Sequence, residues 1–323
     1  MRPLHFSIAA ILALTSIPTA QAQSAYPDRP IRLIVAFAPG GIADIATRTI
    51  ADRLAESIGT SVVVENRGGG GGNTAAAAVA KADPDGYTVL ITTTSIAVNP
   101  FLSDKAGYDI AKDFAPVIQL ASAPNIIVAN PGVGARTLPE AVAKAKAAKF
   151  SFGSPGNGST SHITGAYLFN TLSKADVVHV GYRGGAPAVA DTVGGQTQFA
   201  VVPLPVAASL VQGGQLTALA VTSPARLKDW PDVQTVTESG APFAGYVDET
   251  WVGVFAPAAT PSAITTKLNT HLNKVLDEPA IQARLRTAGL EKQGGSATDF
   301  AKYITTETAK WQRVIRETGV KAD

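Results

Sequence analysis

The stretch IRLIVAFAPGGIAD, residues 31–44, decides the fold. It begins with a largely apolar run, Ile31 to Phe37, which is typical of a buried β-strand. The glycine pair Gly40-Gly41 comes soon after, and apolar residues then recur at helical spacing as far as Ile58. Gly59 follows the last of them, as expected at the end of a helix. The stretch therefore predicts a strand, a glycine loop and an α-helix in that order.

A second stretch of the same kind, FSFGSPGNGSTSH, occupies residues 150–162. It also indicates a strand, at residues 150–152, followed by a glycine-rich loop and the start of a helix. The first N–H groups of a helix lack intrahelical partners and carry partial positive charge, so such a loop can bind an anion. Glycines also serve simply to allow tight turns, and one loop alone leaves both interpretations open. For Asp44, which ends the first stretch, we expect a helix-capping role rather than contact with a ligand.

Strand–helix units recur along both halves of the chain. Further strands are expected at residues 62–64, 87–91, 177–182, 199–202, 216–221 and 251–255, helices at 73–81 and 139–149, and only helices after 255. The last helix should open with a capping box at Ser296. The pattern predicts an α/β protein of two Rossmann-like lobes with parallel strands. We assign residues 23–122 plus 251–323 to lobe 1 and residues 123–250 to lobe 2, with crossovers near 118–128 and 245–256.

The first 22 residues have the form of a signal peptide. Arg2 and His5 precede an apolar stretch from Phe6 to Ile17, and Ala20-Gln21-Ala22 has the small-x-small pattern of a signal peptidase site. The apolar stretch is too short to span a bilayer easily, and no later run reaches about 18 uninterrupted apolar residues. We therefore expect residues 1–22 to be removed and the mature protein to be exported.

The composition narrows the partners and the compartment. The formal net charge is +2 and only 16% of the residues are charged, so no basic field for nucleic-acid binding is present. The chain has no cysteine, which excludes disulfides and the thiol that a lipoprotein anchor needs. We expect a free protein in the periplasm of a Gram-negative cell, with no membrane anchor.

Serines close to a histidine raise the question of catalysis. Ser154, Ser159 and Ser161 all precede His162 within a few residues. The order Gly-Asn-Gly-Ser-Thr at residues 156–160 is not the G-x-S-x-G elbow, and neighbours in the first turn of a helix point in different directions. We therefore expect no enzyme activity, and an exported serine hydrolase using Ser159 and His162 remains the alternative. His162 is expected either to bond a neighbour on its helix or to contact a ligand.

Neither a metal nor a cofactor is expected. The four histidines are scattered and no H-E-x-x-H motif occurs. The glycine loops match neither the G-x-G-x-x-G dinucleotide fingerprint nor the G-x-x-x-x-G-K-[ST] phosphate loop.

Seven ordered motifs resemble those of one family. They are Tyr26-Pro27-x-x-Pro30-Ile31-Arg32-Leu33-Ile34-Val35, Pro39-Gly40-Gly41, Val63-Val64-Glu65-Asn66-Arg67, Asp83-Pro84-Asp85-Gly86-Tyr87, Asp113-Phe114-Ala115-Pro116-Val117, Gly156-Asn157-Gly158-Ser159 with His162, and Leu219-Ala220-Val221-Thr222-Ser223. Together they resemble the Bug family, the extracytoplasmic solute receptors of tripartite tricarboxylate transporters, from Tyr26 to about Gly319. The resemblance implies a type II periplasmic binding protein, a monomer that closes like a flytrap on a small carboxylate in the cleft between its lobes. The loaded receptor would deliver this ligand to membrane transporter subunits.

The resemblance also implies which residues bind the ligand, largely through backbone amides, small polar side chains and water. In lobe 1 they are Phe37, Ala38, Gly40, Gly41, Ile42, Ala43, Thr93, Thr94 and Ser95. In lobe 2 they are Ser154, Asn157, Gly158, Ser159, Thr160, His162, Arg183, Gly184, Gly185, Ala186, Val202 and Pro203. Arg183 is expected either to neutralise a carboxylate in the cleft or to lie in solvent.

Two departures from the common pattern predict a less polar pocket. Relatives often carry a Phe-Asp-Asn-type segment where this chain has Val201-Val202-Pro203, and a frequent threonine is Ala43 here. Together with Ile42, these residues favour a dicarboxylate with an apolar or aromatic body over an amino acid or citrate. A buried ammonium would need acceptors that the substitutions remove. A sensor that presents the loaded form to a membrane signalling protein is the alternative role.

Overall fold

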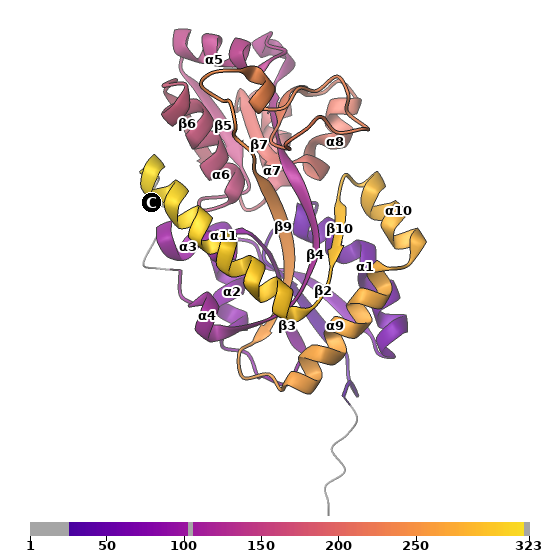
Figure 1. Ribbon diagram of the computed structural model, residues 1–323. Helices are drawn as coiled ribbons and strands as arrows, with labels where there is room; N and C mark the ends of the chain where they lie inside the picture. The colour runs from indigo at the N-terminus through magenta and orange to yellow at the C-terminus, as the bar shows by residue number, and fades with distance from the viewer. Residues whose placement is uncertain (1–25, 103–105, 320–323) are drawn as a thin grey trace, which may run out of the picture.

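The computed structural model describes residues 26–102 and 106–319, so the expected signal peptide lies outside the described residues. The chain forms two lobes, one above the other in Figure 1, and the long strands β4 and β9 run from one to the other. In the first lobe the strand order is β2 (Val62–Asn66), β1 (Ile31–Val35), β3 (Thr88–Thr93), β9 (Glu249–Pro257) and β4 (Phe114–Ala129). From β4 the same sheet continues into the second lobe through β7 (Phe199–Pro203), β5 (Phe150–Ser154) and β6 (Val177–Gly181).

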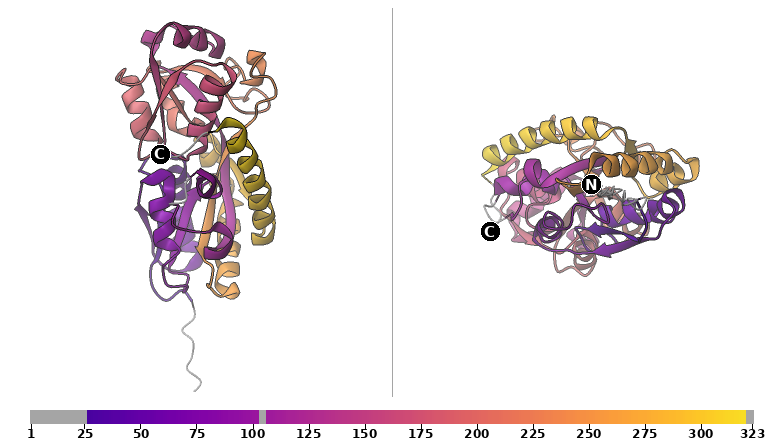
Figure 2. Two further views of the ribbon diagram at one scale, coloured as in Figure 1. Left: turned by 90° about the vertical axis from the view of Figure 1, so that its left-hand side faces the viewer. Right: turned by 90° about the horizontal axis from the view of Figure 1, so that it is seen from below.

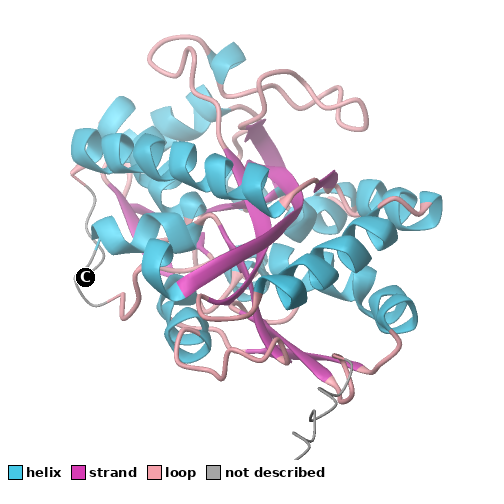
Figure 3. Cartoon of the chain, turned by 60° about the horizontal axis from the view of Figure 1, so that its bottom comes forward, coloured by secondary structure: helices cyan, strands magenta, loops and turns pink. Residues whose placement is uncertain are grey.

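Helices flank the strands on both sides (Figure 3). They are α1 (Ile42–Ile58), α2 (Asn73–Val79), α3 (Ser95–Leu102), α4 (Ile110–Asp113), α5 (Leu138–Ala147), α6 (Thr160–Gly165), α7 (Gly185–Val193), α8 (Leu204–Gln212), α9 (Ser262–Leu276), α10 (Pro279–Thr287) and α11 (Ala297–Thr318). Short 3₁₀ turns lie at Gly70–Gly72, Pro131–Val133 and Thr237–Ser239, and Ala166–Leu172 extends α6 as a π-helix. None of the described helices is both long enough and apolar enough to cross a membrane.

The α/β fold class is confirmed, but the expectation of parallel strands holds only for part of the sheet. β1 pairs in parallel with β2 and β3, and β5 pairs in parallel with β6 and β7. β9 runs antiparallel to β3 and β4, and β4 is also antiparallel to β7 and to β8 (Thr217–Val221). The expectation of only helices after residue 255 was also wrong, because β10 (Glu291–Gly294) pairs with β4.

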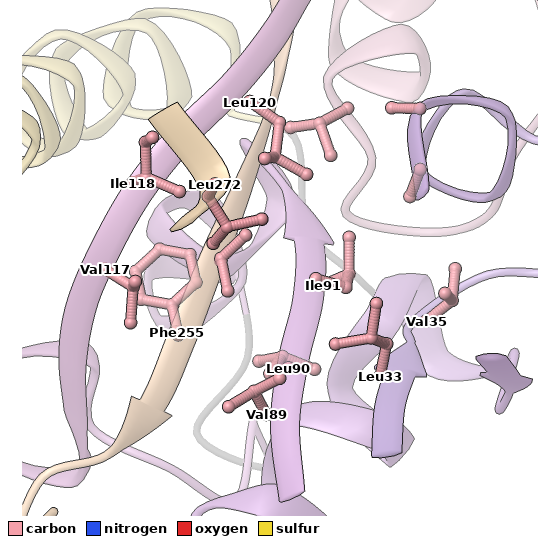
Figure 4. Packing of buried hydrophobic residues seen from close by; sticks show 14 of the residues in the cluster. Leu33, Val35, Val89, Leu90, Ile91, Val117, Ile118, Leu120, Phe255 and Leu272 are labelled. Atoms are coloured by element: carbon pink, nitrogen blue, oxygen red, sulfur yellow. The ribbon is translucent and has the colours of Figure 1, made fainter. Parts of the chain in front are cut away.

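Each lobe buries its own apolar core. In the first lobe, side chains of β1, β3, β4 and β9 meet beneath α1 and α9, and Figure 4 shows Leu33, Leu90 and Phe255 among them. The second lobe has one cluster on each face of its strands, centred on Phe152 and on Val202.

A further small cluster joins the two lobes. Val98 and Leu102 of α3 pack with Ile163 of α6, and Trp311 and Ile315 of α11 complete the group. α11 lies along the side of the molecule, as the left view of Figure 2 shows. The last helix therefore contributes to both lobes although it follows the second crossing of the chain.

Candidate ligand-binding site

The first glycine loop is held by Asp44. Its Oδ2 accepts a 2.9 Å hydrogen bond from the Gly40 N–H, and its Oδ1 accepts one from Asn66 Nδ2 at 2.9 Å. Arg48 Nε donates to the same Oδ1 at 2.9 Å, so the carboxylate, which is only 4% exposed, is paired as well as hydrogen-bonded. Asp44 thus accepts a bond from a loop N–H, as expected, but it is not the helix cap: the N-cap position of α1 is Gly41, which makes no side-chain capping bond. The first-turn N–H groups of α1, those of Ile42, Ala43 and Asp44, have no protein acceptor in the described part of the chain.

The second glycine loop is fixed by its own hydroxyls. Ser159 caps α6, since its Oγ accepts the His162 N–H at 3.1 Å, and Ser154 Oγ accepts the Gly156 N–H at 3.2 Å. The Gly158 N–H donates to His162 Nδ1 at 3.3 Å. These bonds use Ser159 and His162 to shape the loop, which is a structural role and not the nucleophile–base pairing of a hydrolase.

Two stacked histidine rings lie behind this loop. The rings of His162 and His179 are 3.8 Å apart between centroids and nearly parallel, at 19°. Ser154 Oγ and His179 Nε2 are 2.7 Å apart, within hydrogen-bond distance. Burial, and to a smaller extent the neighbouring His162, lowers the pKa of His179 to about 3. His179 is therefore neutral at pH 7.

A pocket lies between the two loops, and its empty space of about 310 Å³ includes open solvent. Its lining is Phe37, Gly41, Ile42, Thr93, Pro155, Ser159, Thr160, Ser161, Gly185, Pro203, Val206 and Thr250. None of these lining residues is charged. Opposing hydroxyls and backbone amides are therefore combined with an apolar wall formed by Phe37, Ile42, Pro203 and Val206.

The polar side of the cavity is connected to the crossing strands. Thr160 Oγ1 and Thr250 Oγ1 are 2.7 Å apart, and Ser161 Oγ donates to Asn125 Oδ1 at 2.7 Å. Asn125 Nδ2 in turn donates to the buried carboxylate of Asp248 at 2.7 Å. Asn125 belongs to β4 and Thr250 to β9, so the hydroxyls that line the cavity are tied to the strands that pass between the lobes.

The structure divides the residues expected from the family resemblance into three groups. Phe37, Gly41, Ile42, Thr93, Ser159, Thr160, Gly185 and Pro203 line the cavity. Ala38, Gly40, Asn157, Gly158, Arg183, Gly184 and Ala186 lie where the two lobes touch; Ala38 N donates to Arg183 O at 3.1 Å, for example. Ala43, Thr94, Ser95, Ser154, His162 and Val202 are buried beside or behind the loops. The Arg183 side chain is exposed, which matches the solvent alternative.

Four lining residues were not predicted from the sequence: Pro155, Ser161, Val206 and Thr250. Pro155 and Ser161 lie inside the stretch 150–162, so a prediction that took the whole loop as lining would have contained them. Val206 and Thr250 lie outside every motif considered, and only the tertiary fold brings them to the cavity. No cluster of histidine and acidic side chains that could hold a metal ion occurs among the residues that the structure describes.

Comparison with known proteins agrees with this geometry. The model of the tripartite tricarboxylate transporter family receptor matches residues 46–320. The chain is 33% identical over 318 residues to the protein BugT of Bordetella pertussis, which covers 97% of each chain. A solved structure, R. palustris Rpa4515 with adipate, superposes with a TM-score of 0.87 at 35% identity, covering 91% of this chain and 98% of that one. MatC from Rhodopseudomonas palustris with bound malate has a TM-score of 0.83 at 29% identity, covering 90% and 100%.

Proposed function

Because this chain belongs to the tripartite tricarboxylate transporter receptor family, whose members are periplasmic solute-binding proteins and not enzymes, we propose that it is a receptor for a small dicarboxylate. Its two lobes hold the ligand between them, and the body of the ligand is apolar, either aliphatic or aromatic. The loaded receptor delivers this ligand to the membrane subunits of a tripartite transporter.

The observation that carries the proposal is a cavity with donors but no charged side chain. A carboxylate is acceptor-only and is bound well by N–H and O–H donors, each charge-assisted bond contributing roughly 1.5–3 kcal/mol. An amino acid would also bury an ammonium group, and this lining has no carboxylate to neutralise it. The lining offers donors of two kinds: the first-turn amides beside Ile42, and the Thr160–Thr250 hydroxyl pair, in which one of the two protons lies between the oxygens.

The apolar wall supports the choice of ligand body. Phe37, Ile42, Pro203 and Val206 are apolar members of the lining and offer no hydrogen-bonding side chain to the third carboxylate and the hydroxyl of a citrate. Burying a polar group against such a wall without partners costs more than burying methylenes, which is favourable by about 0.8 kcal/mol per CH₂.

The test is a binding screen on the mature chain. Adipate, malate, terephthalate, glutamate and citrate are titrated by calorimetry, and the melting temperature is recorded with each. We expect adipate or terephthalate to bind stoichiometrically and to raise the unfolding free energy by about 2.7 kcal/mol at 100 times the Kd. Tight binding of glutamate or citrate, with none of the apolar diacids, would overturn the proposed ligand class.

The remaining parts of the proposal concern the whole chain. Residues 1–22 are a signal peptide, lobe 1 comprises 23–122 plus 251–323, lobe 2 comprises 123–250, and the mature protein is a periplasmic monomer without an anchor. N-terminal sequencing of the periplasmic fraction should begin after Ala22. Light scattering of the same sample should give the mass of one mature chain.

A further inference from the structure

A third glycine run, Gly68–Gly72, forms part of the contact between the lobes. It joins β2 to α2 and contributes no residue to the cavity lining. A Cβ built on Gly71, whose φ is +61°, would overlap the carbonyl oxygen of Asn157 in the second lobe. A Cβ on Gly68 would lie 2.8 Å from the carbonyl oxygen of Arg183. The run therefore packs main chain directly on main chain, an approach that only glycine allows here.

Asn99 of α3 holds this run in place. Its Nδ2 donates to the Gly71 carbonyl at 3.1 Å and to Asn73 Oδ1 at 2.7 Å, and the side chain is only 2% exposed. Its Oδ1 faces the second lobe, since a Cβ built on Gly158 would overlap it. Asn99 therefore fixes the glycine run and also contacts the second glycine loop, although it does not line the cavity either.

We propose that Asn99 and the run Gly68–Gly72 form a closure seat, on which the main chain of Asn157, Gly158 and Arg183 rests only when the lobes are closed. Asn99 and Gly71 are then positioning residues, which set the closed population without touching the ligand. Because only the closed form grips a ligand from both sides, the apparent Kd equals the intrinsic Kd divided by the closed fraction. The choice of adipate as the ligand rests on the proposed function, whereas the contacts of the seat do not.

The first test compares two alanine substitutions with the same backbone conformation. Gly71→Ala adds a Cβ at φ +61° that meets Asn157, whereas Gly214→Ala adds one at φ +69° with no atom within 4 Å. Both variants place alanine in the left-handed region, so their backbone strain is matched. We expect Gly71→Ala to weaken adipate binding about tenfold or more by lowering the closed fraction, while Gly214→Ala stays within about twofold of the parent. Asn99→Ala, which keeps every glycine, should weaken adipate binding as well.

The second test needs no ligand. The chain has no cysteine, and a Cβ on Gly184 would lie 3.0 Å from Ala38 Cβ across the two lobes, so Ala38→Cys with Gly184→Cys can form a disulfide after a small shift. The rate of oxidative cross-linking then reports lobe closure. We expect Gly71→Ala and Asn99→Ala in this background to cross-link more slowly than the parent, and Gly214→Ala to match it.

The outcomes separate the two proposals. If the unsubstituted chain binds none of the carboxylates but Gly71→Ala still slows cross-linking in the double-cysteine background, the ligand proposal fails and the seat stands. If the parent binds adipate and Gly71→Ala matches Gly214→Ala in both tests, the seat is wrong and the receptor proposal stands. Absence of cross-linking in the parent would also overturn the seat, because the two lobes would then not meet as described.

Discussion

Acidification from pH 7 to pH 5 should remove the stability that the neutral His179 side chain contributes. The folded-state pKa of His179 is about 3, while an unperturbed histidine titrates near 6.5. The folded pKa is below the unfolded one, so the unfolded chain takes up a proton first as the pH falls. The contribution of His179 to the free energy of unfolding is therefore fully present above about pH 6.5 and is lost as the pH falls toward 3. pH 5 lies about 1.5 units below the unfolded pKa, and each unit lowers the free energy of unfolding by about 1.36 kcal/mol. The expected loss is therefore about 2 kcal/mol, and somewhat less because the ring is partly solvent-accessible.

The assay is urea unfolding at pH 7 and pH 5, followed by the fluorescence of the buried Trp251 and Trp311. His179→Gln keeps a partner for Ser154 but cannot take up a proton in this range, so it is the matched variant. The parent should lose about 1–2 kcal/mol more than His179→Gln between the two pH values. Equal losses in parent and variant would refute the reasoning, because the buried ring would then not be the group that resists protonation.

Three further predictions concern single side chains. Asp44→Ala removes the acceptor of the Gly40 N–H and should lower the unfolding free energy by about 2 kcal/mol in urea titrations, with Asp44→Asn recovering part of it. Burial raises the pKa of Asp248, so its ionisation opposes folding increasingly as the pH rises above about 3.9. The free energy of unfolding of Asp248→Asn should therefore increase relative to that of the parent between pH 4 and pH 7. Parallel pH profiles of the two proteins would contradict this. Ile42→Ser should weaken adipate binding about tenfold by calorimetry, since about 1.4 kcal/mol of apolar contact is removed, and unchanged affinity would mean that the ligand does not touch this wall.

Local patterns were enough for the elements whose signals are local. The strand at Ile31, the helix that ends before Gly59 and the cap at Ser296 are all present, and Ser296 Oγ accepts the Asp299 N–H at 3.0 Å. The family resemblance, read from ordered motifs, is confirmed by the family match and by the similarity to BugT. These features depend on residues a few positions apart, which is the range over which periodicity and capping act.

Long-range pairing was not visible in the sequence. β4 contains Pro116 and Pro124, which argue against a central strand because proline lacks an N–H donor. In the structure its pairing with β9 is irregular, and the register shifts between Pro116 and Ile118. Antiparallel partners far along the chain, such as β10, leave no periodic signal of their own. Thr250 reaches the cavity only because β9 crosses between the lobes, so no local motif could place it there.

Several amides of the two glycine loops are hydrogen-bonded within the protein and are not free to bind a ligand. The Gly40 N–H is taken by Asp44, the Gly158 N–H by His162, and the Ala38 N–H by the Arg183 carbonyl. The glycines therefore give the loops their shape and allow the lobes to approach, while the donors proposed for a ligand lie at the first turn of α1 and at the Thr160–Thr250 hydroxyl pair opposite. A diacid held in this way must span from one set of donors to the other. If the proposed dicarboxylate binds in this way, its length must match the separation of the closed lobes. The contacts of the proposed closure seat, which lie outside the cavity, set that separation.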